Sequence, residues 1–220
     1  MILSIVLLFI ILLFLYLKTK NLALILKISG SFVFVYMAIW AFFKNPTNPN
    51  YFILVFIGLI FSFLGDVFLV LKSKTDNGFD KIFFLGLASF IITHIFYSLA
   101  FISLGSLNIY TLICTILTFF IFMKFFKSLK NFSFKSMAIP CYIYILAISF
   151  MLCNALSLIS CNLNKTALLF LTIGALLFFI SDFIISFILF FDNCPKFLGI
   201  INLITYYLGQ ILIALSIYYI

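Results

Sequence analysis

Charge is scarce in this chain of 220 residues, and two charged residue types are absent from it. The sequence holds 13 lysines and five aspartates but neither arginine nor glutamate, and charged residues make up 8% of it. A soluble domain carries roughly 25% charged residues, so these residues are too few to cover a surface that faces water. We therefore expect no soluble domain and no nucleic-acid partner, although the formal net charge is +8.

Histidine and cysteine are also too few to suggest a metal site. His94 is the only histidine, and the five cysteines form no CxxC pair and no spacing typical of metal ligands. A zinc ion would have to use His94 together with Asp66 and Asp182, the two acids within apolar runs. We expect no metal and no other cofactor.

Apolar residues, by contrast, are abundant and come in long runs. They make up 67% of the chain, and its mean hydropathy is +1.39. A helix needs about 20 such residues to cross the hydrocarbon of a bilayer. The predicted fold is therefore all-α, a single polytopic transmembrane helical bundle over residues 1–220. Its eight predicted spans are residues 2–17, 22–43, 51–71, 82–104, 107–126, 137–159, 166–191 and 197–220.

The lysines predict how these spans are oriented. Eleven of the 13 lie in or beside the connections that follow the first, third, fifth and seventh spans, and only Lys44 and Lys165 lie on the other side. Cytoplasmic connections of membrane proteins are enriched in lysine. We therefore expect a multi-pass protein of the cell membrane with both termini outside the cytoplasm. The first run lacks the basic start and cleavage site of a signal peptide, so we interpret it as a retained span.

The two halves of the chain resemble each other weakly at an offset of 116 residues. This offset carries Asp66 to Asp182 and His94 to Gln210, whereas most other aligned positions match only as apolar residues. An offset of four spans preserves the direction of each helix, so the pattern favours a parallel 4+4 internal repeat. Two unrelated halves are the alternative.

Asp66 and Asp182 are the only acids inside the predicted spans. An ionisable group in hydrocarbon costs at least about 2.5–3.5 kcal/mol, so it faces the interior of a bundle and usually marks a functional site. Spacings of four place Asp66 on one helix face with Gly58 and Ser62, and Asp182 on one face with Gly174. The alternative is that the two carboxyls only stabilise packing.

Polar residues on two other spans have the spacing of a helix face. His94 and Tyr97 are three residues apart, and Asn202, Tyr206 and Gln210 follow one another at intervals of four. We expect His94, Tyr97, Tyr206 and Gln210 to face the two aspartates and to contact the substrate. A buried histidine with satisfied hydrogen bonds and no ligand is the alternative for His94.

Four segments in order resemble the motifs of one membrane-protein family. Residues 61–69 are similar to F-S-x-x-G-D-x-x-L, residues 86–97 to G-x-x-x-F-x-x-x-H-x-x-Y, and residues 174–182 to G-A-x-L-F-x-x-S-D. Residues 206–213 resemble Y-Y-x-A-Q-x-L-I, with Gly209 in place of the alanine. Together they resemble the YhhN family of membrane lysoplasmalogenases.

This resemblance implies hydrolysis of the vinyl ether bond of a lysoplasmalogen, which releases a fatty aldehyde and a glycerophospho-base. It implies Asp66 and Asp182 as the acid and the base, with a lysophospholipid as the partner in the bilayer. The second span of the family usually opens with Lys-Pro, whereas Ile28 follows Lys27 here. Lys27 either holds the lipid phosphate or only extends its amine to the interface.

Two other functions use paired intramembrane acids. A proton-coupled transporter of a small or lipid-like substrate would fit the acids, the possible repeat and the polar residues. Against it, the only prolines in or beside a span, Pro140 and Pro195, lie near span ends. An intramembrane aspartyl protease has G-x-G-D and Y-D motifs, but here Phe63 and Ser181 stand where a glycine and a tyrosine belong.

Overall fold

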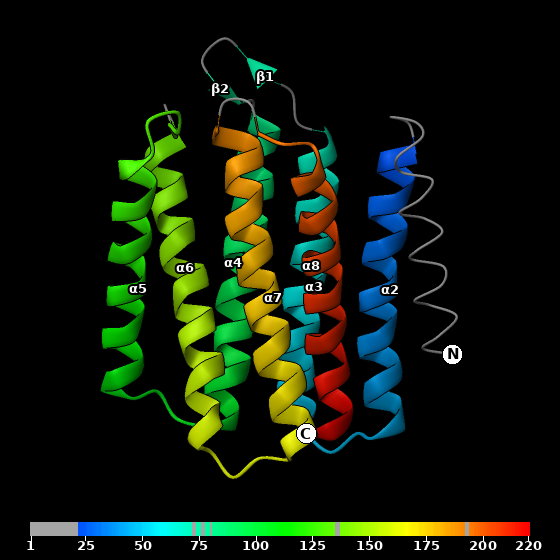
Figure 1. Ribbon diagram of the computed structural model, residues 1–220. Coiled ribbons are helices and arrows are strands. Elements are labelled where there is room, and N and C mark those ends of the chain that lie inside the picture. Colours follow the sequence, from blue (N-terminus) through cyan, green and yellow to red (C-terminus); the bar gives the residue numbers. More distant parts are fainter. Residues whose placement is uncertain (1–21, 72–73, 76–77, 80, 135–136, 192–193) are drawn as a thin grey trace.

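The computed structural model describes residues 22–71, 74–75, 78–79, 81–134, 137–191 and 194–220. Seven helices in these residues are long and apolar enough to cross a membrane (Figure 1). They are α2 (Leu22–Lys44), α3 (Pro49–Leu71), α4 (Lys81–Leu104), α5 (Ile109–Ser128), α6 (Ala138–Ser157), α7 (Lys165–Phe190) and α8 (Phe197–Ser216). The first predicted span, residues 2–17, lies outside the described residues.

The described chain is otherwise made of short elements. Strands β1 (Lys74–Thr75) and β2 (Gly78–Phe79) pair antiparallel between α3 and α4, while the 3₁₀ turns η2 (Leu158–Ser160) and η3 (Ile217–Tyr219) extend α6 and α8. Seven of the eight predicted spans are thus confirmed as helices. Helix α5 begins two residues later than predicted because the side chain of Asn108 caps it, accepting a hydrogen bond from the backbone N–H of Thr111.

The surface of the bundle is apolar, as a lipid environment requires. Large hydrophobic side chains point outward on every long helix, and the exposed fraction reaches 79% at Phe43, 76% at Tyr110 and 73% at Ile139. Water would make such a surface unfavourable, whereas lipid tails are as apolar as leucine. The helices therefore form a multi-pass membrane bundle.

The connections at the two ends of the bundle differ in charge. The α3–α4, α5–α6 and α7–α8 connections lie at one end, and the α2–α3, α4–α5 and α6–α7 connections lie at the other, with the C-terminus (Figure 1). Of the described lysines, only Lys44 and Lys165 lie at the second end. We call the first end the lysine face. The predicted segregation of lysines is thus present in the described bundle.

Helix pairs α3–α4 and α7–α8 are the closest neighbours in the bundle. Helix α2 packs on α3 and α8, α6 packs on α4 and α7, and α5 lies at the edge beside α6 (Figure 1). Helices α7 and α8 meet at two glycines. A Cβ atom on Gly209 would lie 2.9 Å from both the carbonyl oxygen of Gly174 and the amide nitrogen of Phe178. A side chain at Gly209 would force the two backbones apart, so the glycine permits this close approach of α7 and α8.

Helices α3 and α7 begin at corresponding places in the chain. Helix α3 begins at Pro49 and α7 begins at Lys165, so the two starts are 116 residues apart. This is the offset that relates Asp66 to Asp182 in the sequence.

Candidate active site

Asp66 lies on α3, five residues or about 7 Å from the helix end at the lysine face. Its side chain is buried, and two hydroxyl groups donate hydrogen bonds to the same carboxyl oxygen, Oδ2. Ser31 of α2 donates from Oγ at 2.6 Å, and Tyr206 of α8 donates from its phenol at 2.7 Å. Asp66 therefore joins three helices.

A chain of hydrogen bonds leads to Asp66 from deeper in the bundle. The Tyr97 hydroxyl donates to Gln210 Oε1 at 2.5 Å, and Gln210 Nε2 donates to Ser62 Oγ at 2.6 Å. Ser62 Oγ lies 2.8 Å from the Tyr206 hydroxyl. Because a side-chain amide nitrogen can only donate, Ser62 Oγ accepts a hydrogen bond from Gln210. Ser62 then donates its own hydroxyl hydrogen to the oxygen of Tyr206. Every donor in the chain then points toward Asp66.

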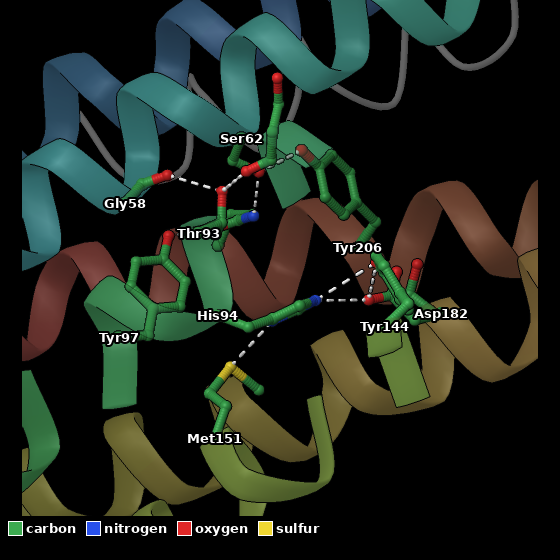
Figure 2. Close-up of polar contacts among 12 residues, drawn as sticks. Gly58, Ser62, Thr93, His94, Tyr97, Tyr144, Met151, Asp182 and Tyr206 are labelled. Atoms are coloured by element: carbon green, nitrogen blue, oxygen red, sulfur yellow. Dashed lines mark hydrogen bonds and ion pairs between the residues drawn. The ribbon is translucent and has the colours of Figure 1, made fainter. Parts of the chain in front are cut away.

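Asp182 lies on α7, eight residues or about 12 Å from the lysine face. The Tyr144 hydroxyl of α6 donates to Asp182 Oδ2 at 2.6 Å, and His94 Nε2 of α4 lies 3.2 Å from the same oxygen. His94 is fully buried, with Nδ1 lying 3.4 Å from the sulfur of Met151. Figure 2 shows the imidazole between this sulfur and the Tyr144–Asp182 pair.

The two carboxyls line one cavity in the half of the bundle nearer the lysine face. Its volume is about 90 Å³, several times the ~10–15 Å³ that one water molecule needs. Lys27, Tyr144 and Tyr206 also contribute to its walls, which are otherwise mostly aromatic and aliphatic. The arrangement can hold water and an apolar ligand between two acids.

The structure therefore brings most of the predicted residues together, in two groups. Tyr206 contacts Asp66 and lines the cavity, and Lys27 lines it from α2. His94, Tyr97 and Gln210 are fully buried and do not appear among the described residues that line the cavity. His94 reaches Asp182 directly, whereas Tyr97 and Gln210 reach Asp66 only through Ser62 and Tyr206.

Sequence reasoning missed two partners of the carboxyls, Ser31 and Tyr144. Both lie on helices whose sequences carry none of the four motifs, and a serine or tyrosine in an apolar span is common. Asn202 lines the cavity, and its amide donates to the carbonyl and hydroxyl oxygens of Ser181 at 2.7 and 2.8 Å. This contact joins α7 to α8.

The described residues contain no group of three or more histidine, cysteine, aspartate or glutamate side chains placed to bind a metal ion. His94 and Asp182 are adjacent, but the next neighbours are Tyr144, which contacts both, and Met151, which contacts His94. The contacts of the two acids are thus hydroxyl and imidazole groups.

The fold and these contacts define a class, that of polytopic helical membrane proteins with two interior carboxyls on one cavity. Comparison with family models then identifies the family. The YhhN family model matches residues 22–217, so the chain belongs to the YhhN family. No curated protein and no solved structure matches the chain.

Proposed function

We propose that this protein is a lysoplasmalogenase-type hydrolase, which cleaves the vinyl ether bond of a single-chain ether phospholipid within the membrane. The observation that carries the proposal is that Asp66 and Asp182, from different helices, line one largely apolar cavity. Membership of the YhhN family supports it. The products would be a fatty aldehyde and a glycerophospho-base.

Hydrolysis of a vinyl ether needs a proton donor and a proton acceptor. A carboxylic acid protonates the alkene carbon that is not bonded to oxygen, which produces an oxocarbenium ion. Water adds to the cation and gives a proton to the second carboxylate, and the resulting hemiacetal breaks into aldehyde and alcohol. One water is consumed with no net change in protons. Glycosidases divide labour between two carboxyl groups around a similar cation.

The contacts of Asp182 are those expected of the proton donor. A thioether sulfur can only accept a hydrogen bond, so the contact between His94 and Met151 requires a proton on His94 Nδ1. The Tyr144 hydroxyl has one hydrogen, which it donates to Asp182 Oδ2, 2.6 Å away. The lone pair of His94 Nε2 then needs a proton from Asp182 Oδ2, 3.2 Å away. The carboxyl and the imidazole thus share one proton, which Asp182 gives to the substrate. The proton that Asp66 takes from water must return to Asp182 to complete the cycle.

The contacts of Asp66 suit the acceptor. Its Oδ2 accepts hydrogen bonds from Ser31 and Tyr206, as a carboxylate does. Ser31 Oγ also lies 2.8 Å from the carbonyl oxygen of Lys27. Once Asp66 has taken a proton from water, Ser31 can turn its hydrogen to that carbonyl and accept from Asp66 instead. Both protonation states of Asp66 are then satisfied without moving a helix.

The remaining predicted residues would act at different distances from the substrate. Lys27 lies on the cavity wall near the lysine face, where its ammonium would meet the phosphate of a lysolipid. Tyr206 would touch the substrate beside Asp66. Tyr97 and Gln210 would act as positioning residues, because they fix the direction of the hydrogen bonds that end on Asp66.

The chain would also have arisen from two copies of one helical unit in parallel. The starts of α3 and α7, which are 116 residues apart, support this, and so do the contacts of the acids. Asp66 is bonded by α2 and α8, and Asp182 by α6 and α4. An offset of 116 converts α2 into α6 and α4 into α8. Each carboxyl therefore receives one partner from its own unit and one from the other.

The lysine face would lie in the cytoplasm, with the C-terminus on the other side, because lysine-rich connections remain cytoplasmic. Fusions at Ile220 test this orientation. A reporter that is active only outside the cytoplasm should work there, and one that is active only in the cytoplasm should not. The opposite result would reverse the orientation.

A proton-coupled transporter is the second candidate, and the presence of two interior acids on one cavity favours it. The two functions differ in what they need. A hydrolase works in detergent without a gradient and changes its substrate covalently, whereas a transporter requires a sealed membrane and returns its substrate intact.

The test is to incubate the purified protein in detergent with matched alkenyl and acyl lysolipids and to assay free aldehyde and fatty acid. We expect aldehyde from the alkenyl lipid and no fatty acid from the ester, because carbon protonation needs the electron-rich alkene. Added chelator should leave the rate unchanged. Failure to release aldehyde would refute the hydrolase, and ready ester cleavage would indicate a different lipase.

A further inference from the structure

The cavity has a polar side and a phenylalanine side. Lys27 and Asp66 lie on α2 and α3, whereas Phe122 of α5 and Phe179 and Phe183 of α7 line the other side. Asp182 lies on α7 beside Phe183 and also lines the cavity. A ligand that occupies the whole cavity must therefore be polar at one end and apolar at the other.

The phenylalanine side lies at a junction between α5 and α7, where aromatic rings of the two helices meet. Helix α5 lies beside α6 and reaches α7 through side chains. The centroid of the Phe122 ring is 5.0 Å from that of Phe179 and 5.4 Å from that of Phe183, and both pairs meet edge to face. Phe125 adds a ring contact to Phe183 at 5.6 Å. These rings are only partly buried.

The junction lies at the depth of lipid tails. Phe122 is six residues from the end of α5 at the lysine face, or about 9 Å, and Phe179 is 11 residues from the end of α7, or about 16 Å. Half of the hydrocarbon thickness is about 15 Å. The junction therefore opens toward the hydrocarbon of the leaflet on the lysine side, below the level of Lys27 and Asp66.

We propose that the hydrocarbon chain of a single-chain phospholipid lies along Phe122, Phe179 and Phe183 and leaves the cavity between α5 and α7. The site is continuous with the two carboxyls, and its charged end matches a phosphate. Ring contacts between helices in lipid have no hydrophobic driving force, so an aliphatic chain can replace them at little cost. The inference rests on the proposed function for its choice of a lysolipid.

Binding of uncleavable lipids tests this site separately from catalysis. The probes are hexadecyl and octyl saturated ether lysophosphocholines, which lack the alkene, and their dissociation constants are measured on the purified protein. Phe179→Trp should weaken binding of the hexadecyl lipid about fivefold or more, the lower end of the cost of overpacking. The octyl lipid, whose shorter chain places fewer carbons along and beyond the junction, should lose less affinity than the hexadecyl lipid.

Two further variants make the test specific. Phe120→Trp adds the same bulk to α5 on a side chain that is 59% exposed, and it should leave both affinities unchanged. Phe179→Leu widens the junction and should retain or improve hexadecyl binding, which also covers the case in which the tryptophan variant does not fold. Equal effects on both chain lengths, or none on either, would overturn the site. If binding depends on the length of the hydrocarbon chain but alkenyl lipids release no aldehyde, the hydrolase would be refuted. The proposed site for the hydrocarbon chain would still be supported.

Discussion

Asp66 and Asp182 occupy equivalent places in α3 and α7, each eight residues after a glycine, yet their surroundings differ in kind. Asp66 is held by two hydroxyl groups, from Ser31 and Tyr206. Asp182 is held by one hydroxyl group and an imidazole. The difference comes from neighbouring helices and not from the helix that carries the acid. Two similar helices can therefore present carboxyls for opposite tasks.

The two closest helix pairs also differ in what their glycines contact. A Cβ atom on Gly58 of α3 would collide with the ring of Tyr97 in α4, whereas one on Gly174 of α7 would meet Ile213 and the backbone of α8. Tyr97 and Ile213 are 116 residues apart. In the first pair the glycine makes room for a tyrosine that belongs to the hydrogen-bond chain, and in the second it lets two backbones touch.

Removing either carboxyl should have the largest effect. Asp66→Asn and Asp182→Asn keep the volume but remove the proton and the charge, and we expect each to reduce aldehyde release about 10²–10⁴-fold, the usual contribution of a general acid or base. The rate of alkenyl lysolipid cleavage measures this. Asp76→Asn, outside the spans, is the control. Full activity in both carboxyl variants would end the two-acid mechanism.

The imidazole should matter less than the carboxyl it contacts. His94→Gln removes the group that shares a proton with Asp182, and we expect kcat to fall about 10–10²-fold while KM changes less than twofold. Steady-state kinetics on the alkenyl lipid separate the two constants. If KM rises and kcat is unchanged, His94 binds substrate, as the sequence alone suggested.

The hydroxyl donors to Asp66 should have smaller and similar effects. Ser31→Ala and Tyr206→Phe each remove one hydrogen bond to the carboxylate, typically worth about 1.5–3 kcal/mol for a charged group. We expect a kcat loss of about 10-fold for each. A much larger loss for Tyr206→Phe would show that its hydroxyl takes part in the reaction. Thr205→Ala, whose hydroxyl bonds its own helix, is the control.

The smallest effect on activity should come from the helix contact. Gly209→Ala forces a methyl group against the backbone of α7, and overpacking of this kind costs about 1–3 kcal/mol. We expect a lower midpoint of thermal unfolding in detergent. Gly199→Ala lies on the same helix with nothing within 4 Å of the added carbon, so it should be neutral. Equal midpoints would mean that α7 and α8 can separate without cost.

The sequence was sufficient for the helices and for the two acids. Long apolar runs predict spans because few other structures use them, and Asp66 and Asp182 are the only acids within the runs. Ser31 and Tyr144 could not be predicted, because serine and tyrosine carry no cost in a span that would single them out. Which partner each acid has depends on how the helices pack, and spacing along one helix does not contain that information.

The cavity explains a further difference from expectation. Tyr97 and Gln210 share helix faces with residues of the site, as their spacing predicted, but they lie behind Tyr206 and Ser62 as seen from the cavity. One face of a helix carries residues at several distances from the cavity. The spacing of residues in the sequence predicts the face, but only the packing of the helices determines the distance.

The amide of Gln210 has a consequence for a protein that lies across an energised membrane. Hydroxyl groups can pass a proton along by accepting one and releasing another, but an amide would have to become an imidic acid to do so. Gln210 therefore lets the chain from Tyr97 fix the orientation of Tyr206 while insulating Asp66 from protons on the far side of the bilayer. The proposed proton transfers would then proceed inside the membrane without a leak that would discharge the ion gradient.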